Sequence, residues 1–595
     1  MMRSVNAWFR AIREGREDGM ALITVVIFGT VLVMLVATAA AFAGSGAMKS
    51  RTDDDWNAAM AAAYAGLEDY KARLANDNTY VQYRNPDAPF SATSTGALPP
   101  TTNRALLLGT GPDKWAQVPS GDPDKPSRAY YRYEVDNSQY STTGVVRLRS
   151  TGMVGTEIRS IVVNVRQTGF IDFLYFTDFE VKDPSQSNSA CATSTGKPNY
   201  AWYYSTNTHA SACTEIQFGA NDTINGPLHS NDTLLICGST FNGPVTTSNP
   251  KTPFFTKVDG CADPIFNKGT PTLDATIGMP QTNSQMKTET RLDVDSVKRP
   301  GCLYTGPTII TFTSDGNMNV KSPFTSVTQI KGDPAGAGSG TPAMCGTPGN
   351  VANGLGSPGG ATIPVIPQNL IYVQDVPSVP TTTDKNGWPS GTWPTGFTCT
   401  NSPTTGSGFT FGTAAFPMAN EDVPTASPSH YGCRKGDVYV QGTVHGQITV
   451  AAQDYVYITG DLLYQDSTKD ILGLVGNNAV WVWNPFNGST PLLGKNRTIY
   501  AAILSVAHTF MVQNYDKGTA KRGTLNVYGA IAQEYRGTVG TAGSPGTGYD
   551  KNYNYDPRFK YTAPPKFLSP VSTSYGVSTL VEVPKAFTPD GSAAG

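Results

Sequence analysis

Three patterns of apolar and polar residues follow one another along the chain. The first runs from Met20 to Met48, where no charged side chain interrupts a mainly apolar sequence. About 20 apolar residues are enough to cross a bilayer as a helix. The arginines before this run indicate that the N-terminus stays in the cytoplasm; they are Arg3, Arg10, Arg13 and Arg16. This pattern predicts a single-pass membrane segment.

The second pattern is a helical stripe directly downstream. Its larger apolar residues recur every three or four positions and are Trp56, Met60, Ala63, Leu67, Tyr70 and Leu74. That spacing places them on one face of an α-helix, and no proline lies between Met20 and Tyr80. We therefore expect one helix from the membrane segment to Asn76, about 85 Å long. The stripe requires a second layer to pack against.

The third pattern is strict alternation, which is typical of a half-buried strand. Three runs show it, with apolar residues Tyr131, Tyr133 and Val135, then Val146 and Leu148, then Ile161, Val163 and Val165. The polar residues between them include Arg132, Arg147, Arg149 and Arg166, and a turn is expected at residues 154–156. These runs predict an antiparallel sheet that is covered on one face.

With a short charged leader that ends at Gly19, the apolar run and the continuation DWNAAMAAAYAGLEDY, the chain resembles the type IV pilin superfamily. It is most similar to the PilX-like minor pilins, in particular the large actinobacterial-type proteins with a PilX N-terminal domain. The resemblance implies a prepilin peptidase that cuts between Gly19 and Met20 and methylates the new N-terminus. It also implies a helix that leaves the membrane to join other pilins and the pilus assembly machinery in a surface filament.

Two other interpretations of the N-terminus stay open. A signal peptidase would cut after Ala43, because residues 41–43 fit the A-x-A pattern, although the apolar run exceeds the usual signal core. An uncleaved anchor fits the length alone. The chain also departs from the pilin pattern, since Thr24 replaces the glutamate that the family places five residues into the mature chain. In the family that carboxylate pairs with a neighbour's terminal amine, so its loss favours a position at the filament tip.

The remainder of the chain is rich in short strands with glycine at their corners. Two related units, INGPLHS at 224–230 and FNGPVTT at 241–247, share an N-G-P core and follow one another closely, and further strands are expected at 438–441, 447–451 and 455–459. Recurring short strands without helices predict a parallel β-helix or related solenoid; a β-sandwich is the alternative. Residues 332–360 and 376–430, rich in Gly, Pro, Thr and Ser, are expected to form long loops.

These patterns divide the chain into five parts. We expect a leader at 1–19, the long helix at 20–76, the sheet region at 77–168, the β-helix-like extracellular domain at 169–535, and a C-terminal aromatic strap and tail at 536–595. The aromatic residues of 548–568 are interpreted as a strap over an open end of the solenoid, with a ligand surface for sugars or peptides as the alternative.

Composition agrees with an exported β protein. Charged residues make up 15% of the chain, while Gly (61) and Pro (43) are abundant. The net charge of −2 without a long basic run argues against nucleic acid as a partner. An even number of cysteines in an exported chain favours disulfides, although their pairing cannot be deduced from spacing. The candidates are Cys191, Cys213, Cys237, Cys261, Cys302, Cys345, Cys399 and Cys433.

No motif predicts a catalytic, cofactor or metal site. The histidines form no H-E-x-x-H pair and no D-x-D-x-D-G loop is present, so calcium at 76–78 or 231–232 is only a weak alternative. A carbohydrate-active enzyme with a β-helix domain is the alternative function, for which the candidate residues are Asp437, Asp454, Asp461 and His445. The sequence favours a non-enzymatic minor pilin-like protein whose extracellular head serves assembly priming or adhesion to a surface polysaccharide or protein.

Overall fold

The chain forms two compact units in this computed structural model. Residues 20–91, 96–120, 124, 126–140, 145–167, 169–185, 191, 213–220, 222–379, 381–400, 408–422, 431–543, 545–570 and 575–594 are described. The smaller unit comprises Met1–Gln139, Val145–Val165 and Thr579–Gly595, and the larger one Tyr140–Gly144 and Arg166–Ser578. In sequence, the larger unit is therefore an insertion into the smaller one. The expected leader, with Gly19, lies outside the described residues.

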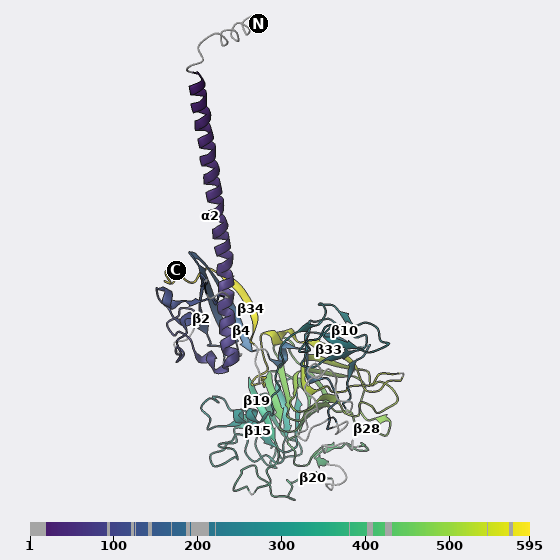
Figure 1. Cartoon of the computed structure of the whole chain (residues 1–595). Coiled ribbons are helices and arrows are strands. Elements are labelled where there is room, and N and C mark those ends of the chain that lie inside the picture. Colours follow the sequence, from purple (N-terminus) through teal and green to yellow (C-terminus); the bar gives the residue numbers. More distant parts are fainter. Residues whose placement is uncertain are drawn as a thin grey trace. The chain divides into compact units, whose positions relative to one another are not determined.

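Helix α2, Met20–Asn76, is a single element of 57 residues (Figure 1). Its described residues from Leu22 to Asp54 are exposed, whereas the face that begins at Ala59 is buried. Alanine-rich sequence without proline allows such a helix to continue unbroken, because neither a missing N–H group nor a ring clash interrupts it. The expected long helix is confirmed.

The sheet of the smaller unit has the strand order β1-β2-β3-β4-β34 (Figure 1). Its strands are β1 (Ala116–Gln117), β2 (Ala129–Asp136), β3 (Val145–Val154), β4 (Glu157–Gln167) and β34 (Tyr575–Val583). The pairings of β1 with β2 and of β2 with β3 are antiparallel. The three alternating runs are β2, β3 and β4, and Gly155 makes the turn between the last two with φ of +60°. Strand β34 had no counterpart in the sequence prediction.

The expectation that only one face of this sheet is covered was wrong at Arg132, although Arg147 on the same face is exposed. Arg132 of β2 is fully buried, and its guanidinium donates to the carbonyl oxygens of Gly109, Lys114 and Gly591. The rings of Trp115 and Phe587 lie 4.1 and 4.6 Å from its Cζ atom. Alternation places Arg132 on the solvent side of the sheet, yet the C-terminal segment covers it. The contact with Gly591 joins residues that are 459 positions apart.

The larger unit is a parallel β-helix, which excludes the β-sandwich alternative. Its longest ladder follows the spatial order β15, β19, β24, β26, β30, β32, β5, β8, β11 and β14, and every neighbouring pair is parallel. The bounds are Cys302–Thr305, Asn369–Gln374, Gln447–Ala452, Ile471–Gly476, Arg497–Ser505, Thr524–Tyr535, Tyr175–Phe179, Leu228–Ser230, Val245–Thr247 and Thr272–Leu273.

Two further sets of parallel strands complete each coil. The second ladder contains part of β25 (Tyr455–Tyr464), β30 and β32, then β33 (Asp550–Tyr555), β7 (Thr223–Asn225), β10 (Thr240–Phe241) and β13 (Ile265–Phe266). The third contains β16 (Thr308–Phe312), β23 (Val438–Val444), β25, β27 (Ala479–Val482) and β31 (Phe510–Val512), with a separate set of β6 (Gln217–Phe218), β9 (Leu234–Ile236) and β12 (Phe255–Lys257). The strands expected at 438–441, 447–451 and 455–459 are β23, β24 and β25.

The loops carry a few antiparallel strands. Strands β17 (Asn317–Lys321) and β18 (Ala361–Pro364) extend β16, whereas β20 (Phe397–Cys399), β21 (Phe409–Phe411) and β22 (Ala414–Phe416) form a sheet of their own. A short hairpin joins β28 (Phe486–Asn487) to β29 (Thr490–Pro491). Residues 332–360 contain no strand among the described residues, as expected for a long loop.

The coils are not stacked in sequence order, and this corrects two expectations. Strand β32 pairs with both β30 and β5, and β33 lies between β32 and β7. The first part of the aromatic segment, strand β33 at Asp550–Tyr555, therefore lies inside the stack and is not a strap over an open end. The boundary expected at residue 535 was also wrong, since residues up to 578 belong to the larger unit and residues from 579 to the smaller one.

The two N-G-P units form neighbouring corners of the β-helix. Val245 of the second unit pairs with Leu228 of the first in parallel register. A Cβ atom added at Gly243 would overlap the backbone of Gly226, so glycine is required where the two coils approach most closely. The asparagines of the same units also stack, because Asn242 Nδ2 donates to Asn225 Oδ1 over 2.6 Å.

The eight cysteines form four disulfides that join neighbours in sequence. The pairs are Cys191–Cys213, Cys237–Cys261, Cys302–Cys345 and Cys399–Cys433. Each closes a loop of the larger unit, with sequence separations between 22 and 43. The prediction of disulfides is confirmed, and the structure supplies the pairing that spacing left open.

Candidate functional site

The first half of α2 offers a continuous apolar surface. Its large side chains from Leu22 to Phe42 are exposed, with relative exposures between 48% and 78%. The polar groups among them are satisfied by the helix itself, because the hydroxyls of Thr30 and Thr38 donate to carbonyl oxygens three and four residues earlier. Such internal hydrogen bonds are required where water is excluded. Among the described helices, α2 is long and apolar enough to cross a membrane.

The residues expected for processing lie at the beginning of this helix. Met20 is its first residue, and Thr24 lies one turn further and is exposed. The structure thus places Met20 and Thr24 at the start of α2, whereas Gly19 lies outside the described residues.

The second half of α2 packs directly against the sheet. Ala63, Leu67, Tyr70 and Leu74 of the predicted stripe are buried, and Met60 is partly buried. Trp56 differs from the expectation because 45% of it is exposed; the guanidinium of Arg159 lies 4.8 Å from its ring centroid.

Small residues set the distance between helix and sheet, and the sequence analysis missed them. A Cβ atom added at Gly152 of β3 would overlap backbone atoms of Ala59 and Ala63 in α2. The neighbouring Ser150 hydroxyl donates to the carbonyl oxygen of Ala63 over 2.7 Å. Gly66 fits tightly as well, since an added Cβ would lie 3.0 Å from Tyr131. Glycine inside an alternating strand was the signal that could have indicated this close approach.

A buried polar network fixes the end of the helix. Asp69 accepts a hydrogen bond of 2.8 Å from Arg73 and one of 2.9 Å from the Tyr133 hydroxyl. Asn103 donates to the hydroxyls of Tyr133 and Tyr80, over 2.6 and 2.8 Å. Burial, followed by the charge of Asp69, raises the pKa of Tyr133 well above its ordinary value. The neutral phenol therefore remains a donor at any physiological pH, and the network holds α2 in one register on the sheet.

Of the residues considered for an enzyme, Asp437 and Asp454 lie in one cluster. Asp437 accepts a hydrogen bond from the backbone N–H of Tyr455, and Lys435 Nζ lies 3.5 Å from Oδ2 of both Asp454 and Asp375. Burial raises the pKa of Asp437 well above its ordinary value. Burial, a hydrogen bond with Asp375 and the charge of Asp375 raise the pKa of Asp454 to about 7.

The other two candidates have different partners. Asp461 accepts from the backbone N–H of Thr498 over 3.0 Å and from Arg497 over 3.3 Å, while His445 Nδ1 lies 3.5 Å from Asp470 Oδ2. Asp461 and His445 thus have partners other than those of the Asp437 and Asp454 cluster. Among the described residues, no three His, Cys, Asp or Glu side chains are grouped to hold a metal ion.

No protein-family model and no curated protein matches the sequence. Comparison with solved structures gives a match to the competence-associated pilin ComZ from Thermus thermophilus. The two chains are 12% identical, the match covers 89% of this chain and 97% of that chain, and the TM-score is 0.24. A TM-score of this size establishes neither a common family nor a common function.

Proposed function

We propose that this chain is a minor pilin-like component of a type IV pilus or related filament. Helix α2 anchors it in the membrane and later docks among other pilins, and the β-helix is an extracellular head for assembly priming or adhesion. The observation that carries the proposal is the division of one helix into an exposed apolar half and a half that is buried on an antiparallel sheet. A plain anchor requires the apolar residues but not their rigid continuation into the folded domain.

The proposal includes processing by a prepilin peptidase between Gly19 and Met20. The new N-terminus would then belong to the apolar helix itself, with the charged leader removed. A cut after Ala43 would instead discard the most apolar part of α2 and leave the head without its anchor. The apolar half would then serve only as an export signal.

The proposal also places the subunit at the filament tip. Thr24 carries no carboxylate that can neutralise a neighbour's terminal amine, and an unpaired charge in an apolar filament core is costly. The larger unit takes up most of the chain, and such a head is accommodated more easily at the end of a helical lattice than along it. Labelled antibody against the head should therefore mark filament ends, and labelling along the whole shaft would contradict the tip position.

The test is the N-terminus of the protein recovered from membrane and sheared-surface fractions, read by mass spectrometry. A methylated Met20 supports the proposal, whereas Gly44 at the terminus or an intact leader overturns it. Gly19→Leu should leave an unprocessed precursor in the membrane. Gly29→Leu is the matched control, because a side chain at this helical glycine meets nothing within 4 Å, and it should be processed normally.

A further inference from the structure

A wide groove lies on the β-helix. It has a volume of about 920 Å³ and is lined by three stretches of chain. The first stretch lies within 285–299 and the third within 562–569. The second consists of Gln368, just before β19, and Gln447, the first residue of β24. Ligand sites in proteins commonly have volumes of about 300–1,000 Å³, so this groove is large enough for several units of a polymer.

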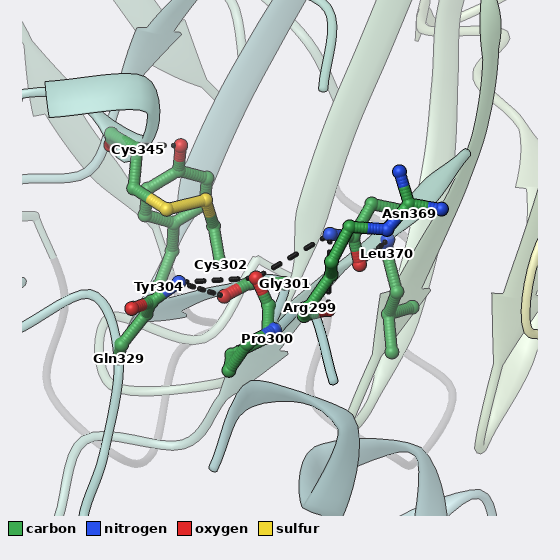
Figure 2. Close-up of a disulfide and its surroundings, with 9 residues drawn as sticks. All are labelled: Arg299, Pro300, Gly301, Cys302, Tyr304, Gln329, Cys345, Asn369 and Leu370. Atoms are coloured by element: carbon green, nitrogen blue, oxygen red, sulfur yellow. Dashed lines mark hydrogen bonds between the residues drawn. A yellow bond between two sulfur atoms is a disulfide. The ribbon is translucent and has the colours of Figure 1, made fainter. Parts of the chain in front are cut away.

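The groove is preformed. Figure 2 shows the backbone of 299–301 held between Gln329 and Asn369, beside the Cys302–Cys345 disulfide. Gln329 donates to the carbonyl oxygen of Pro300 over 3.0 Å, and Asn369 donates to those of Arg299 and Pro300 over 3.3 Å. A rim that is fixed before binding loses little conformational freedom when a ligand arrives.

The charge of the groove is positive although the chain as a whole is slightly acidic. Lys298, Arg299 and Lys566 line it, and Glu289 is the one carboxylate among its lining residues. Lys566 Nζ lies 2.8 Å from Glu289 and donates to the carbonyl oxygen of Arg299 over 2.9 Å. Lys298 and Arg299 are exposed and have no ion-pair partner in the described part of the chain. Two cations are therefore available to an anionic ligand.

The remaining lining groups suit a sugar polymer. Gln285, Gln368, Thr288 and Ser296 offer amide and hydroxyl groups, which can exchange hydrogen bonds with sugar hydroxyls. A groove for single-stranded nucleic acid would instead need exposed aromatic rings for stacking. The one aromatic lining residue, Phe567, packs over Gly473, where an added Cβ would lie 2.8 Å from its ring.

We propose that this groove binds an acidic polysaccharide, whose carboxylate or phosphate groups contact Lys298 and Arg299. The inference deepens the adhesion part of the proposed function and rests on the head being displayed outside the cell. It assigns a ligand class and a place of binding that the pilin-like architecture does not supply.

Binding is measured with full-length protein in mild detergent by fluorescence anisotropy. The probes are labelled oligomers of galacturonic acid, of mannose phosphate, of neutral glucose and of single-stranded DNA. We expect an acidic glycan to bind and the neutral one not to bind, and we expect added salt to weaken the complex. Binding of galacturonate assigns carboxylates as the ligand groups, and binding of mannose phosphate assigns phosphates; either result supports the proposal.

Three variants localise the site. The double variant K298Q/R299Q should weaken binding about tenfold or more, because each removed cation loses a charge-assisted contact. The double variant K251Q/K268Q removes two exposed lysines that do not line the groove, and it should bind like the unmodified chain. Glu289→Gln should tighten binding, since it removes the carboxylate that competes with the ligand.

Several results would overturn the proposal. One is the absence of glycan binding at millimolar glycan concentration. Another is a loss of affinity in K251Q/K268Q equal to that in K298Q/R299Q. The third is DNA that binds more tightly than both acidic glycans and loses this affinity in K298Q/R299Q. Because purified protein is used, failure of glycan binding leaves the N-terminal processing test unaffected. An unprocessed leader likewise leaves the binding result intact.

Discussion

The contact between β32 and β5, which are neighbours in the head but distant in the sequence, can be tested by a single substitution. Arg536 follows β32 and Glu180 follows β5; Arg536 Nη1 lies 2.6 Å from Glu180 Oε2, and both side chains are only 1% exposed. The guanidinium carbon also lies 3.5 Å from the ring centroid of Phe218. Arg536→Met keeps much of the side-chain volume but leaves the buried carboxylate without its cation.

The expected cost is large because the pair is fully desolvated. Removing one partner of a buried ion pair costs about 3–5 kcal/mol, since the other charge stays buried. The hydroxyls of Thr177 and Ser230 still donate to Glu180, which favours the lower part of that range. Glu180→Gln in the same chain removes the stranded charge, so the double variant should be destabilised by about 1–3 kcal/mol less than the sum of the single variants.

The assay is hydrogen exchange with mass spectrometry on the full-length protein. In Arg536→Met, amides of β5, β8 and β32 should exchange about 100-fold faster or more, because each 1.36 kcal/mol is a factor of about ten. Arg291→Met, which breaks an exposed pair with Asp293, is the matched control and should leave these strands unchanged. Unchanged exchange in Arg536→Met, or strictly additive effects in the double variant, would refute the reasoning.

Three further predictions concern single positions. Gly243→Ala should destabilise the head by about 1–3 kcal/mol in urea unfolding, because its Cβ overlaps the adjacent coil; Gly494→Ala, with nothing within 4 Å, should not. Gly152→Ala should push α2 off the sheet and speed proteolysis within 59–74, and an unchanged cleavage rate would contradict the contact. The raised pKa of Asp454 means that the folded head keeps a proton which the unfolded chain releases. The contribution of this carboxyl group to stability is therefore complete below about pH 4 and falls by roughly 1–4 kcal/mol up to about pH 7. Asp454→Asn should flatten this slope and Asp461→Asn should not; equal slopes in all three proteins would disprove the assignment.

Local patterns predicted the local elements well. The apolar run and the stripe predicted α2, and strict alternation predicted β2, β3 and β4, because the helix and strand periods are properties of short segments. The short strands around Val438 to Tyr464 were likewise located from the glycines at their corners. The layer that buries each face can lie far away in the sequence, as Ser150 contacts Ala63 across 87 positions, but the apolar period of the segment itself is local.

Long-range pairing was not predicted, because no local pattern encodes it. Arg132 alternates with apolar residues and is expected to be exposed, yet Phe587 and the Gly591 carbonyl bury it. The sequence offered 548–568 as an alternative ligand surface, but the other wall of the groove was missed, since Arg299 and Lys566 are separated by 267 positions. The pairing of β32 with β5 is equally remote, because Gln533 donates to the Tyr175 hydroxyl across 358 positions.

The unusual order of the coils follows from the insertion of the head into the smaller unit. Strands β4 and β34 are neighbours in one sheet. The inserted chain must therefore leave this sheet after β4 and return to it at β34, at nearby points. A solenoid of about ten coils stacked in sequence order would separate its ends by roughly 43 Å, at about 4.8 Å per coil. Here β5 and β33 both pair with β32, so the chain enters and leaves the stack at adjacent coils. The Arg536–Glu180 ion pair therefore lies where two segments that are distant in the sequence must pair. For this reason, its loss should expose the amides of β32 and β5 before those of the other strands of the head.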